Sequence, residues 1–280
     1  MKRNVIVTCS NEKYGDFLVN HWLRSLKENV NLDNTDVVVI DYGLNLRQLN
    51  LLQQNNALII RGSGSGHVVN LRFVDAGKFL KKQNYHQVLF VDGGDIIFQS
   101  DISDLFNRDR DSYRVVKLGL EVLYFETFIP RTFSGPFKDR LWRVLAGKPV
   151  LNAGLIFAPK DKFVTLCDQV AKLVTKKDKY GPDQVIVNYV LYQNKIKLLD
   201  KKYNFMLGCE NEDFKIKNGI FFKKNGEKIA VVHNAGHDSL LRPVGNFGFG
   251  LGYNHLKLSI YYGRKCLFGL FGLGKRLQRH

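Results

Sequence analysis

Short apolar runs separated by amphipathic segments dominate the first half of the chain. The runs at 4–9, 37–40, 58–60 and 88–91 have the length of strands and lack a helical period. Segments 17–26 and 74–82 instead carry apolar side chains at helical spacing. The resulting order is strand, helix, strand, strand, helix, strand, which predicts an α/β fold with a mostly parallel sheet.

The second half continues the alternation less regularly. Strands are predicted at 113–119, 151–158, 195–199 and 229–232, and a helix at 163–172. Another helix is predicted to begin at Pro182, because proline at the first position and Asp183 in the first turn are typical of a helix start.

Two segments leave alternatives open. Segment 125–148 mixes aromatic and basic residues, and is either a ligand-binding insertion or a partly helical excursion whose aromatic side chains pack in the core. The glycine-rich segment 61–67 is either a mobile lid or a plain surface loop. It lacks the lysine of a P-loop.

Polar residues follow three of the predicted strands. The stretch VLFVDGGDIIF at 88–98 interrupts its apolar run with Asp92, two glycines and Asp95, while Ser10 and Asn11 follow the first strand and Asp41 the second. The carboxyl ends of parallel strands meet at one edge, where open α/β sheets bind ligands. Carboxylates there suit a hard cation such as Mg²⁺ or Mn²⁺, although aspartate also forms ordinary turns.

Composition narrows the choice of partner. The 280 residues are 45% hydrophobic and carry a net charge of +16, with a pI of about 9.6. Such a charge favours an anionic partner: nucleic acid, an anionic membrane surface or a phosphorylated substrate. The four cysteines are scattered without a zinc-ligand spacing, which fits a reducing compartment. We see no signal peptide and no run of about 20 apolar residues, so we expect a cytoplasmic protein.

The last 26 residues differ from the rest. Segment 255–280 has six lysines and arginines, no acidic residue, and bulky apolar residues between the basic ones. This pattern is typical of a segment on the inner, anionic face of a membrane, and the alternative is a terminal helix docked on the body. Glycines at 263, 269, 272 and 274 argue against one continuous helix. We therefore expect a body at 1–254 and a basic amphipathic extension at 255–280.

Four stretches in a fixed order resemble one family. After the aspartate motif come LNAGLIFA at 151–158, GPDQVIVN at 181–188 and VVHNAG at 231–236. This set, spread over residues 4–238, resembles the GT-A glycosyltransferases, in particular the branch of glycogenin and the bacterial lipopolysaccharide galactosyl- and glucosyltransferases. The resemblance implies a single Rossmann-like GT-A domain. It also implies retaining, metal-dependent transfer of a sugar from a nucleotide-sugar, most often a UDP-sugar, to a glycan, lipid-linked or protein acceptor.

The resemblance also implies roles for individual residues. Asp95 and His233 fall on the positions that ligate Mn²⁺ or Mg²⁺, and Asp92 is a further candidate ligand. Residues that fall on the uridine, sugar and catalytic positions are Thr8, Ser10, Asn11, Asp41, Asn152, Gly154, Asp183 and Gln184, with Gln184 near the anomeric carbon. Lys78 and Arg242 are further candidates for stabilising the diphosphate. The family spacing is Asp-x-Asp, whereas this chain has Asp-Gly-Gly-Asp, so either Asp92 still ligates across a longer turn or Gly93 takes its place.

Rival functions are weighed by the motifs they need. A nucleic-acid-binding protein fits the charge, but no usual module is present, and we expect no nucleic-acid partner. A nucleotidyltransferase needs a glycine-rich phosphate loop, which TCSNEKYGD at 8–16 matches poorly. A degenerate domain that binds the donor without turnover stays open because of the altered aspartate motif. Glu121 and Glu126 are unplaced as nucleophiles, so we expect attack assisted by the leaving phosphate.

Overall fold

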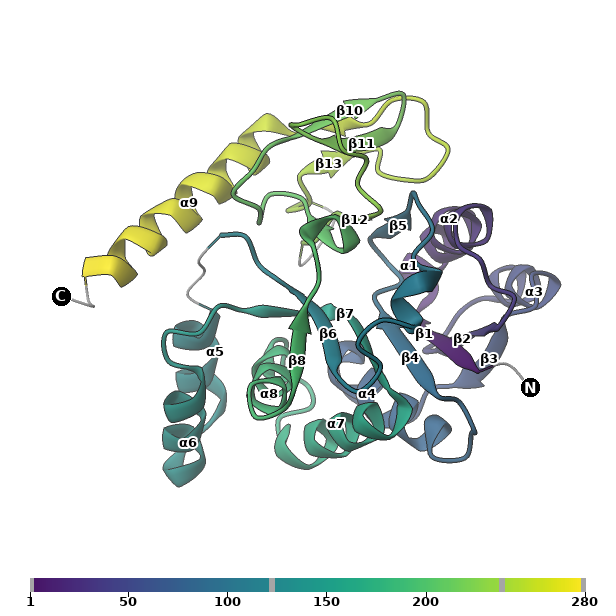
Figure 1. Cartoon of the computed structure of the whole chain (residues 1–280). Helices are drawn as coiled ribbons and strands as arrows, with labels where there is room; N and C mark the ends of the chain where they lie inside the picture. Colours follow the sequence, from purple (N-terminus) through teal and green to yellow (C-terminus); the bar gives the residue numbers. More distant parts are fainter. Residues whose placement is uncertain (1–2, 121–123, 237–239, 278–280) are drawn as a thin grey trace.

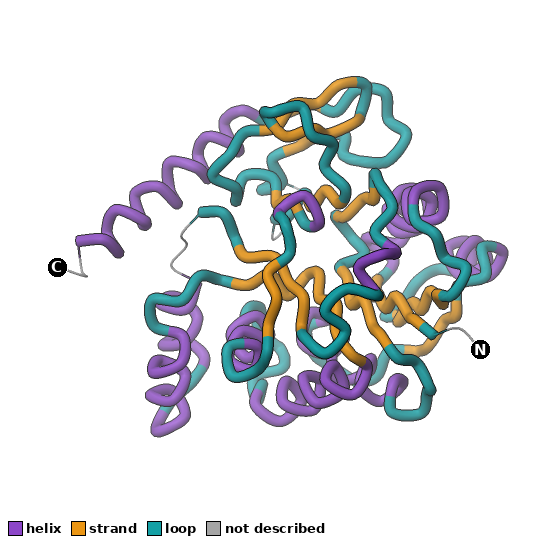
Figure 2. Tube along the Cα trace, in the orientation of Figure 1, coloured by secondary structure: helices purple, strands orange, loops and turns teal. Residues whose placement is uncertain are grey.

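A seven-stranded sheet forms the centre of the molecule (Figures 1 and 2). The computed structural model describes residues 3–120, 124–236 and 240–277, and all of their side chains except those of 268, 269 and 271–277. The strands follow the order β3-β2-β1-β4-β7-β6-β8. Their bounds are β1 Asn4–Ser10, β2 Thr35–Asp41, β3 Leu58–Arg61, β4 Gln87–Val91, β6 Tyr113–Lys117, β7 Leu151–Pro159 and β8 Ile196–Leu198.

Strand direction agrees with the predicted class. Strands β1 to β4 run parallel to one another, as do β6 and β8, and only β7 runs antiparallel to both of its neighbours. The prediction of an α/β fold with a mostly parallel sheet is thus confirmed. Because β1 lies between β2 and β4, the carboxyl ends of these three strands lie side by side.

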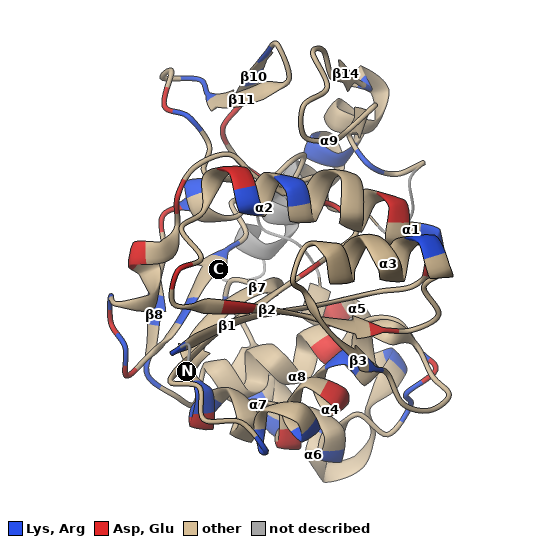
Figure 3. Cartoon of the chain, turned by 90° about the vertical axis from the view of Figure 1, so that its right-hand side faces the viewer, with Lys and Arg blue, Asp and Glu red and all other residues tan. Residues whose placement is uncertain are grey.

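Helices cover both faces of the sheet, which Figure 3 shows nearly edge-on. Alternate residues of each buried strand face opposite cores, so that Val5 and Val7 of β1 pack on one side and Ile6 on the other. On the side of Ile6 lie α1 Glu12–Phe17, the π-helical turn η1 Leu18–Trp22, α2 Leu23–Asn29 and α3 Leu46–Gln54. On the side of Val5 lie α4 Val68–Leu80, α5 Tyr124–Thr132, α6 Gly135–Leu145, α7 Lys160–Leu173 and α8 Pro182–Leu191.

Helices α3 and α4 differ from the sequence-based expectation, and segment 125–148 follows one of its two alternatives. Helix α3 was not predicted, although a capping box between Asn45 and Gln48 marks its start. Helix α4 begins at Val68 rather than at residue 74, after the side chain of His67 accepts the hydrogen bond of the Val69 amide. Segment 125–148 forms α5 and α6, whose buried apolar side chains pack in the core, as one of the two alternatives proposed.

A smaller sheet on the far side of the strand ends holds residues distant in sequence. Its order is β5-β12-β9, with β5 Ile96–Phe98, β9 Phe205–Met206 and β12 Val231–His233. Strand β12 is antiparallel to β5 and pairs His233 with Ile96. This register places the imidazole beside Asp95, which precedes β5. Shorter elements nearby are η2 Ser103–Phe106, η3 Lys201–Tyr203, the hairpin β10 Phe214–Lys217 and β11 Ile220–Lys223, and the pair β13 Val244–Gly245 and β14 His255–Leu256.

The C-terminal segment forms one helix, α9 Leu258–Leu277, which extends away from the body (Figure 1). The expectation that its glycines prevent a continuous helix was wrong, because a helical glycine costs only about 1 kcal/mol relative to alanine. Its first turns are anchored by buried Tyr261, which donates a 2.7 Å hydrogen bond to Asp213 and packs edge-on against Phe214. Among the described residues, no helix has the length and apolarity needed to cross a bilayer.

Candidate active site

The turn after β4 brings both aspartates of the central motif to one place. A Cβ on Gly93 would lie 2.6 Å from Thr8 Oγ1 and 2.8 Å from the Cys9 carbonyl, so the turn packs against the end of β1 in a way that only glycine allows. Asp92 and Asp95, on either side of the two glycines, both reach the same cluster. Of the two alternatives for the Asp-Gly-Gly-Asp spacing, the geometry therefore favours the longer turn with Asp92 in place.

Asp92, Asp95 and His233 form a compact triad. His233 Nε2 lies 3.4 Å from Asp95 Oδ1 and 3.9 Å from Asp92 Oδ2, and the three candidate ligand atoms lie within 4.8 Å of one another. Two carboxylate oxygens and one imidazole nitrogen are donors that Mn²⁺ and Mg²⁺ accept in proteins. The residues present thus fit a divalent cation.

A chain of amides fixes the orientation of the imidazole. Asn204 donates to Asn152 Oδ1 at 3.0 Å, so its own carbonyl oxygen is the atom 3.1 Å from His233 Nδ1. Nδ1 must then carry the proton, and Nε2 is left facing the two carboxylates. A cation or a proton at Nε2 relieves the repulsion between these three electron-rich atoms, which is the arrangement expected of a ligand.

Two arginines hold the outer oxygens of the same carboxylates. Arg72, whose side chain is 7% exposed, contacts Asp92 Oδ1 directly and lies 3.6 Å from Asp183. Arg242 lies 3.2 Å from Asp95 Oδ2 and donates a 2.8 Å hydrogen bond to the Gly94 carbonyl. Each aspartate therefore has one oxygen on an arginine and the other on the side of His233.

Burial and these charges shift the pKa values of Asp183 and Asp95 in opposite directions. Burial raises the pKa of Asp183 to about 6, more than the nearby Arg72 guanidinium lowers it. Burial also acts to raise the pKa of Asp95, but His233, Arg242 and Arg72 together hold it below the ordinary value. Asp95 is thus kept ionised, while Asp183 titrates near neutrality.

A cavity of about 300 Å³ opens beside the triad. The polar residues of its lining are Arg72, Asp92, Asp95, Asn152, Asp183, Gln184 and His233. Other residues that line it, mostly apolar, are Leu118, Tyr124, Val150, Met206, Cys209 and Ala235. Arg264 of α9 also reaches this cavity, where it donates hydrogen bonds to the Ala235 carbonyl at 2.6 Å and to Cys209 Sγ at 2.8 Å.

The residues predicted on β7 and α8 lie at this cavity. Asn152 Oδ1 accepts hydrogen bonds from the Gly154 amide and from Asn204. Gln184 is tied to the β7 backbone, since its carbonyl accepts from the Ala153 amide at 3.0 Å and its amide donates to the Leu151 carbonyl. A Cβ on Gly154 would lie 2.5 Å from Asp92 Oδ2, so glycine is required there for the triad to assemble.

The residues predicted after β1 and β2 lie at the adjacent strand ends. Thr8 Oγ1 and Asn11 Oδ1 are buried and have no hydrogen-bond partner within the described part of the chain. The hydroxyl of Ser10 donates to the Asn11 carbonyl. Asp41 accepts from the amides of Gly43 and Leu44, the pattern of an aspartate that forms a turn.

Lys78 does not line the cavity. It is largely exposed on α4, 3.2 Å from Ser63 Oγ and 3.6 Å from Asp75. Glu126 lies half-buried on α5, whereas Glu121 and the side chains of the basic residues beyond 270 lie outside what the structure describes.

Sequence analysis missed Arg72 and Asn204, which contact residues of the triad. Arg72 lies among apolar residues on the buried face of α4, and a lone arginine at a core position of a helix is the signal that could have found it. Asn204 stands between two aromatic residues and gave no such signal, because only the folding of β9 beside β12 brings it to His233.

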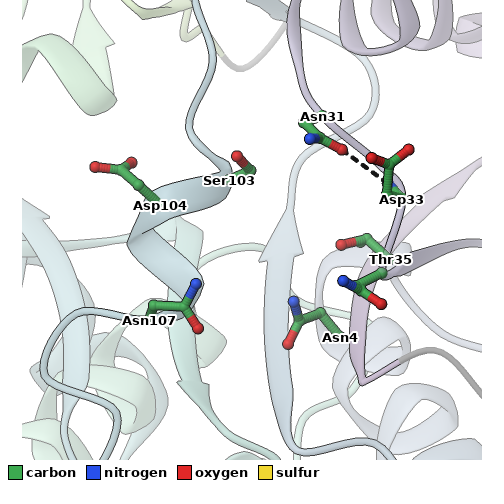
Figure 4. A pocket seen from close by; sticks show the side chains of 8 residues that line it. Asn4, Asn31, Asp33, Thr35, Ser103, Asp104 and Asn107 are labelled. Carbon is green, nitrogen blue, oxygen red and sulfur yellow. Dashed lines mark hydrogen bonds between the residues drawn. The ribbon is translucent and has the colours of Figure 1, made fainter.

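A second hollow, of about 350 Å³, lies at the opposite edge of the sheet (Figure 4). It is lined by Asn4, Asn31, Asp33, Asn34, Thr35, Ser103, Asp104 and Asn107, at the amino ends of β1 and β2 and beside η2. The Asp33 amide donates a hydrogen bond to Asn31 Oδ1 within one turn, as the dashed line in Figure 4 marks. It has no arginine or histidine, and it resembles a polar surface depression.

Comparison with solved structures identifies the fold. The galactosyltransferase LgtC, crystallised with donor and acceptor sugar analogs, superposes with a TM-score of 0.56 at 14% identity, covering 95% of each chain. An active-site mutant of LgtC with glutamine replaced by glutamate matches equally. The bifunctional glycosyltransferase WbbM, solved in its apo form, gives a TM-score of 0.55 at 17% identity over 86% of this chain and 47% of its own.

These likenesses confirm the expected GT-A fold, and at such low identities they establish the fold alone. No protein-family model matches the sequence, and no curated protein matches it.

Proposed function

We propose that the protein is a glycosyltransferase that moves a sugar from a UDP-sugar to an acceptor. The observation that carries this proposal is the Asp92–Asp95–His233 triad beside a cavity at the carboxyl edge of a GT-A sheet. The structural neighbours support it, because LgtC binds donor and acceptor sugar analogs.

The donor would lie along the strand ends from β1 to β7. The buried oxygens of Thr8 and Asn11, which lack partners in the described chain, suit the polar edge of a nucleobase such as uracil. The ring of Tyr14 lies against Gly94, with the Arg242 guanidinium 5.2 Å from its centre. An aromatic face of this kind suits base stacking.

The diphosphate would bind at the triad. A bound Mn²⁺ or Mg²⁺ supplies Lewis-acid stabilisation of the charge that develops on the leaving oxygen. Arg242, which pairs with Asp95, would add a positive charge close to where that oxygen would lie. Asp92, Asp95 and His233 would hold the ion, and the amide chain through Asn204 would keep His233 Nε2 turned toward the two carboxylates.

The sugar would lie against the polar residues that line the cavity. Asn152 and Asp183 present oxygens to the donor hydroxyls, and a partly protonated Asp183 can also donate a hydrogen bond. Gln184 would lie near the anomeric carbon. The choice of a glutamine-to-glutamate change for the active-site mutant of LgtC supports a role for a glutamine in such sites. We propose retention of configuration, with attack assisted by the leaving phosphate.

The surface around α9, where we place the acceptor, has features of a membrane-binding surface. The cavity reaches Arg264 of α9, while apolar side chains of the same helix are turned to solvent: Leu258, Tyr262, Leu267 and Leu270. The neighbouring hairpin adds exposed Lys215 and Lys217, with Lys224 just beyond it. Apolar residues flanked by lysines suit an anionic leaflet, so we propose peripheral attachment through α9.

Thermal unfolding with UDP, with and without Mn²⁺, tests the main proposal. A ligand that binds only the folded state raises the melting temperature by mass action, so UDP with Mn²⁺ should stabilise the protein. UDP-sugars that also stabilise it would then be tested for release of UDP. Stabilisation without turnover would indicate the degenerate donor-binding alternative. Absence of stabilisation by UDP and by other nucleoside diphosphates would overturn the proposal.

Sedimentation with phosphatidylglycerol vesicles tests the membrane contact. Leu270→Glu places a charge on the exposed face of α9 and should lower vesicle binding by about tenfold, because burying a carboxylate in the interface is unfavourable. Leu46→Glu on α3 is the matched control, since Leu46 is likewise exposed but lies on another face. Equal loss from both variants, or no loss from Leu270→Glu, would contradict this part of the proposal.

A further inference from the structure

The charges around the triad carry an inference about how cation and nucleotide binding are linked. Asp92, Asp95 and Asp183 bring three negative charges to the cavity when ionised, and a site of that charge would bind a divalent cation strongly by itself. Arg72 and Arg242 contact the same carboxylates and cancel two of these charges. The site therefore offers ligand atoms that suit a divalent cation, but its net charge is small.

The two arginines are held very differently. Arg72 is buried, with its guanidinium 5.2 Å from the rings of both Phe73 and Phe90, and its Nε donates to the Val69 carbonyl at 3.2 Å. It is a fixed counter-ion, shared between Asp92 and Asp183.

Arg242 lies in the segment that follows His233, and its side chain is 14% exposed, against 7% for Arg72. It pairs with Asp95 at 3.2 Å and donates a 2.8 Å hydrogen bond to the Gly94 carbonyl, while its Nε is buried without a partner among the residues that the structure describes. Its guanidinium also lies over the face of Tyr14. These contacts are ones that a side chain can exchange for an incoming anion, because the unused Nε donor would gain an acceptor.

We propose that Arg242 is a removable counter-ion that makes cation binding depend on the diphosphate. While Arg242 pairs with Asp95, it weakens the attraction of the triad for a divalent cation. An incoming diphosphate takes over the guanidinium, frees the outer oxygen of Asp95, and adds negative charge of its own. The cation then binds tightly. This proposal rests on the proposed function of the site, and adds that a positive side chain of the protein suppresses cation binding before the nucleotide arrives.

This proposal and a simple positioning role for Arg242 predict opposite changes in cation affinity when Arg242 is removed. If Arg242 only oriented Asp95, its removal would weaken cation binding with or without nucleotide. If it is a removable counter-ion, Arg242→Met should tighten binding of Mn²⁺ to the protein alone by about tenfold. The same change should weaken binding of UDP and reduce the cooperativity between UDP and Mn²⁺.

The experiment measures free Mn²⁺ by electron paramagnetic resonance during titration of the purified full chain, with and without UDP. Arg47→Met is the matched control, because Arg47 pairs with Asp16 on the surface and its loss removes the same charge outside the site. We expect wild type and Arg47→Met to bind Mn²⁺ weakly alone and at least about tenfold more tightly with UDP. Arg242→Met should lose most of this difference by gaining affinity in the absence of UDP.

Two results would overturn the inference while leaving the proposed function standing. One is weaker Mn²⁺ binding by Arg242→Met in both conditions, and the other is Mn²⁺ affinity of the wild type that UDP does not change. Arg242→Lys should restore the wild-type behaviour in part, because it keeps the charge without the second donor. Failure of UDP to bind the wild type under any condition would instead overturn the proposed function.

Discussion

The two hollows at opposite edges of the sheet are similar in size and different in chemistry. The cavity at the carboxyl ends has about 300 Å³ and brings buried ionisable side chains together from β4, α4, α8 and β12. The hollow at the amino ends has about 350 Å³ and is lined by amides, hydroxyls and exposed aspartates near the surface. Volume therefore does not tell which of the two hollows is the candidate active site.

The burial of charged side chains does distinguish the candidate active site from the second hollow. In the cavity, Arg72, Asp183 and His233 are each less than a tenth exposed, so their charges interact strongly and are held in fixed geometry. In the hollow of Figure 4, Asp33 is exposed and water screens its charge. Parallel substitutions in the two hollows should therefore have very unequal consequences.

The largest difference is expected for catalysis. Asp95→Asn removes a charged ligand candidate of the triad with little change of shape, and should lower the turnover of a UDP-sugar by about 100–1000-fold. Asp104→Asn in the second hollow should leave turnover unchanged. The measurement is release of UDP, with circular dichroism to show that both variants fold. Full activity of Asp95→Asn would end the assignment of the triad as the metal site.

A steric test of the same cavity should have the next largest effect. Gly154→Ala puts a methyl group at 2.5 Å from Asp92 Oδ2 and must displace that carboxylate. We expect affinity for Mn²⁺ in the presence of UDP to fall by about 10–100-fold. Gly252→Ala, where a Cβ meets no atom within 4 Å, is the matched control. Titration calorimetry compares the two, and equal affinities would show that Asp92 needs no exact placement.

The smallest effect is on stability and depends on pH. The pKa of Asp183 is raised from its ordinary 3.8 to about 6, so its ionised form destabilises the folded state. The stability linked to this group is complete below pH 4 and is lost as the pH rises through 6. Asp183→Asn should therefore raise the free energy of unfolding at pH 8 by up to about 3 kcal/mol, and change it little at pH 4.

Chemical denaturation at both pH values measures this difference. Asp33→Asn, an exposed aspartate of the second hollow, should change stability by less than about 0.5 kcal/mol at either pH. A loss of stability in Asp183→Asn at pH 8 would mean that the contact with Arg72 outweighs the cost of burying the charge.

The sequence by itself determined the class of fold and the position of Asp92 and Asp95 at the edge of the sheet. Apolar runs of strand length alternating with helical periods predicted the sheet, and a strand that stops at Asp-Gly-Gly-Asp placed the carboxylates at its edge. These features are local, since strand length, turn residues and helix starts depend on neighbours a few positions away.

Only the tertiary structure decided which residues meet. His233 stands 138 positions after Asp95, and the pairing of β12 with β5 places it there. Arg72 and Asn204 became site residues because α4 packs under the sheet and β9 lies beside β12. Lys78, six residues beyond Arg72 on the same helix, faces solvent instead. Such encounters depend on long-range packing, and the pattern of residues along the chain does not encode them in any single stretch.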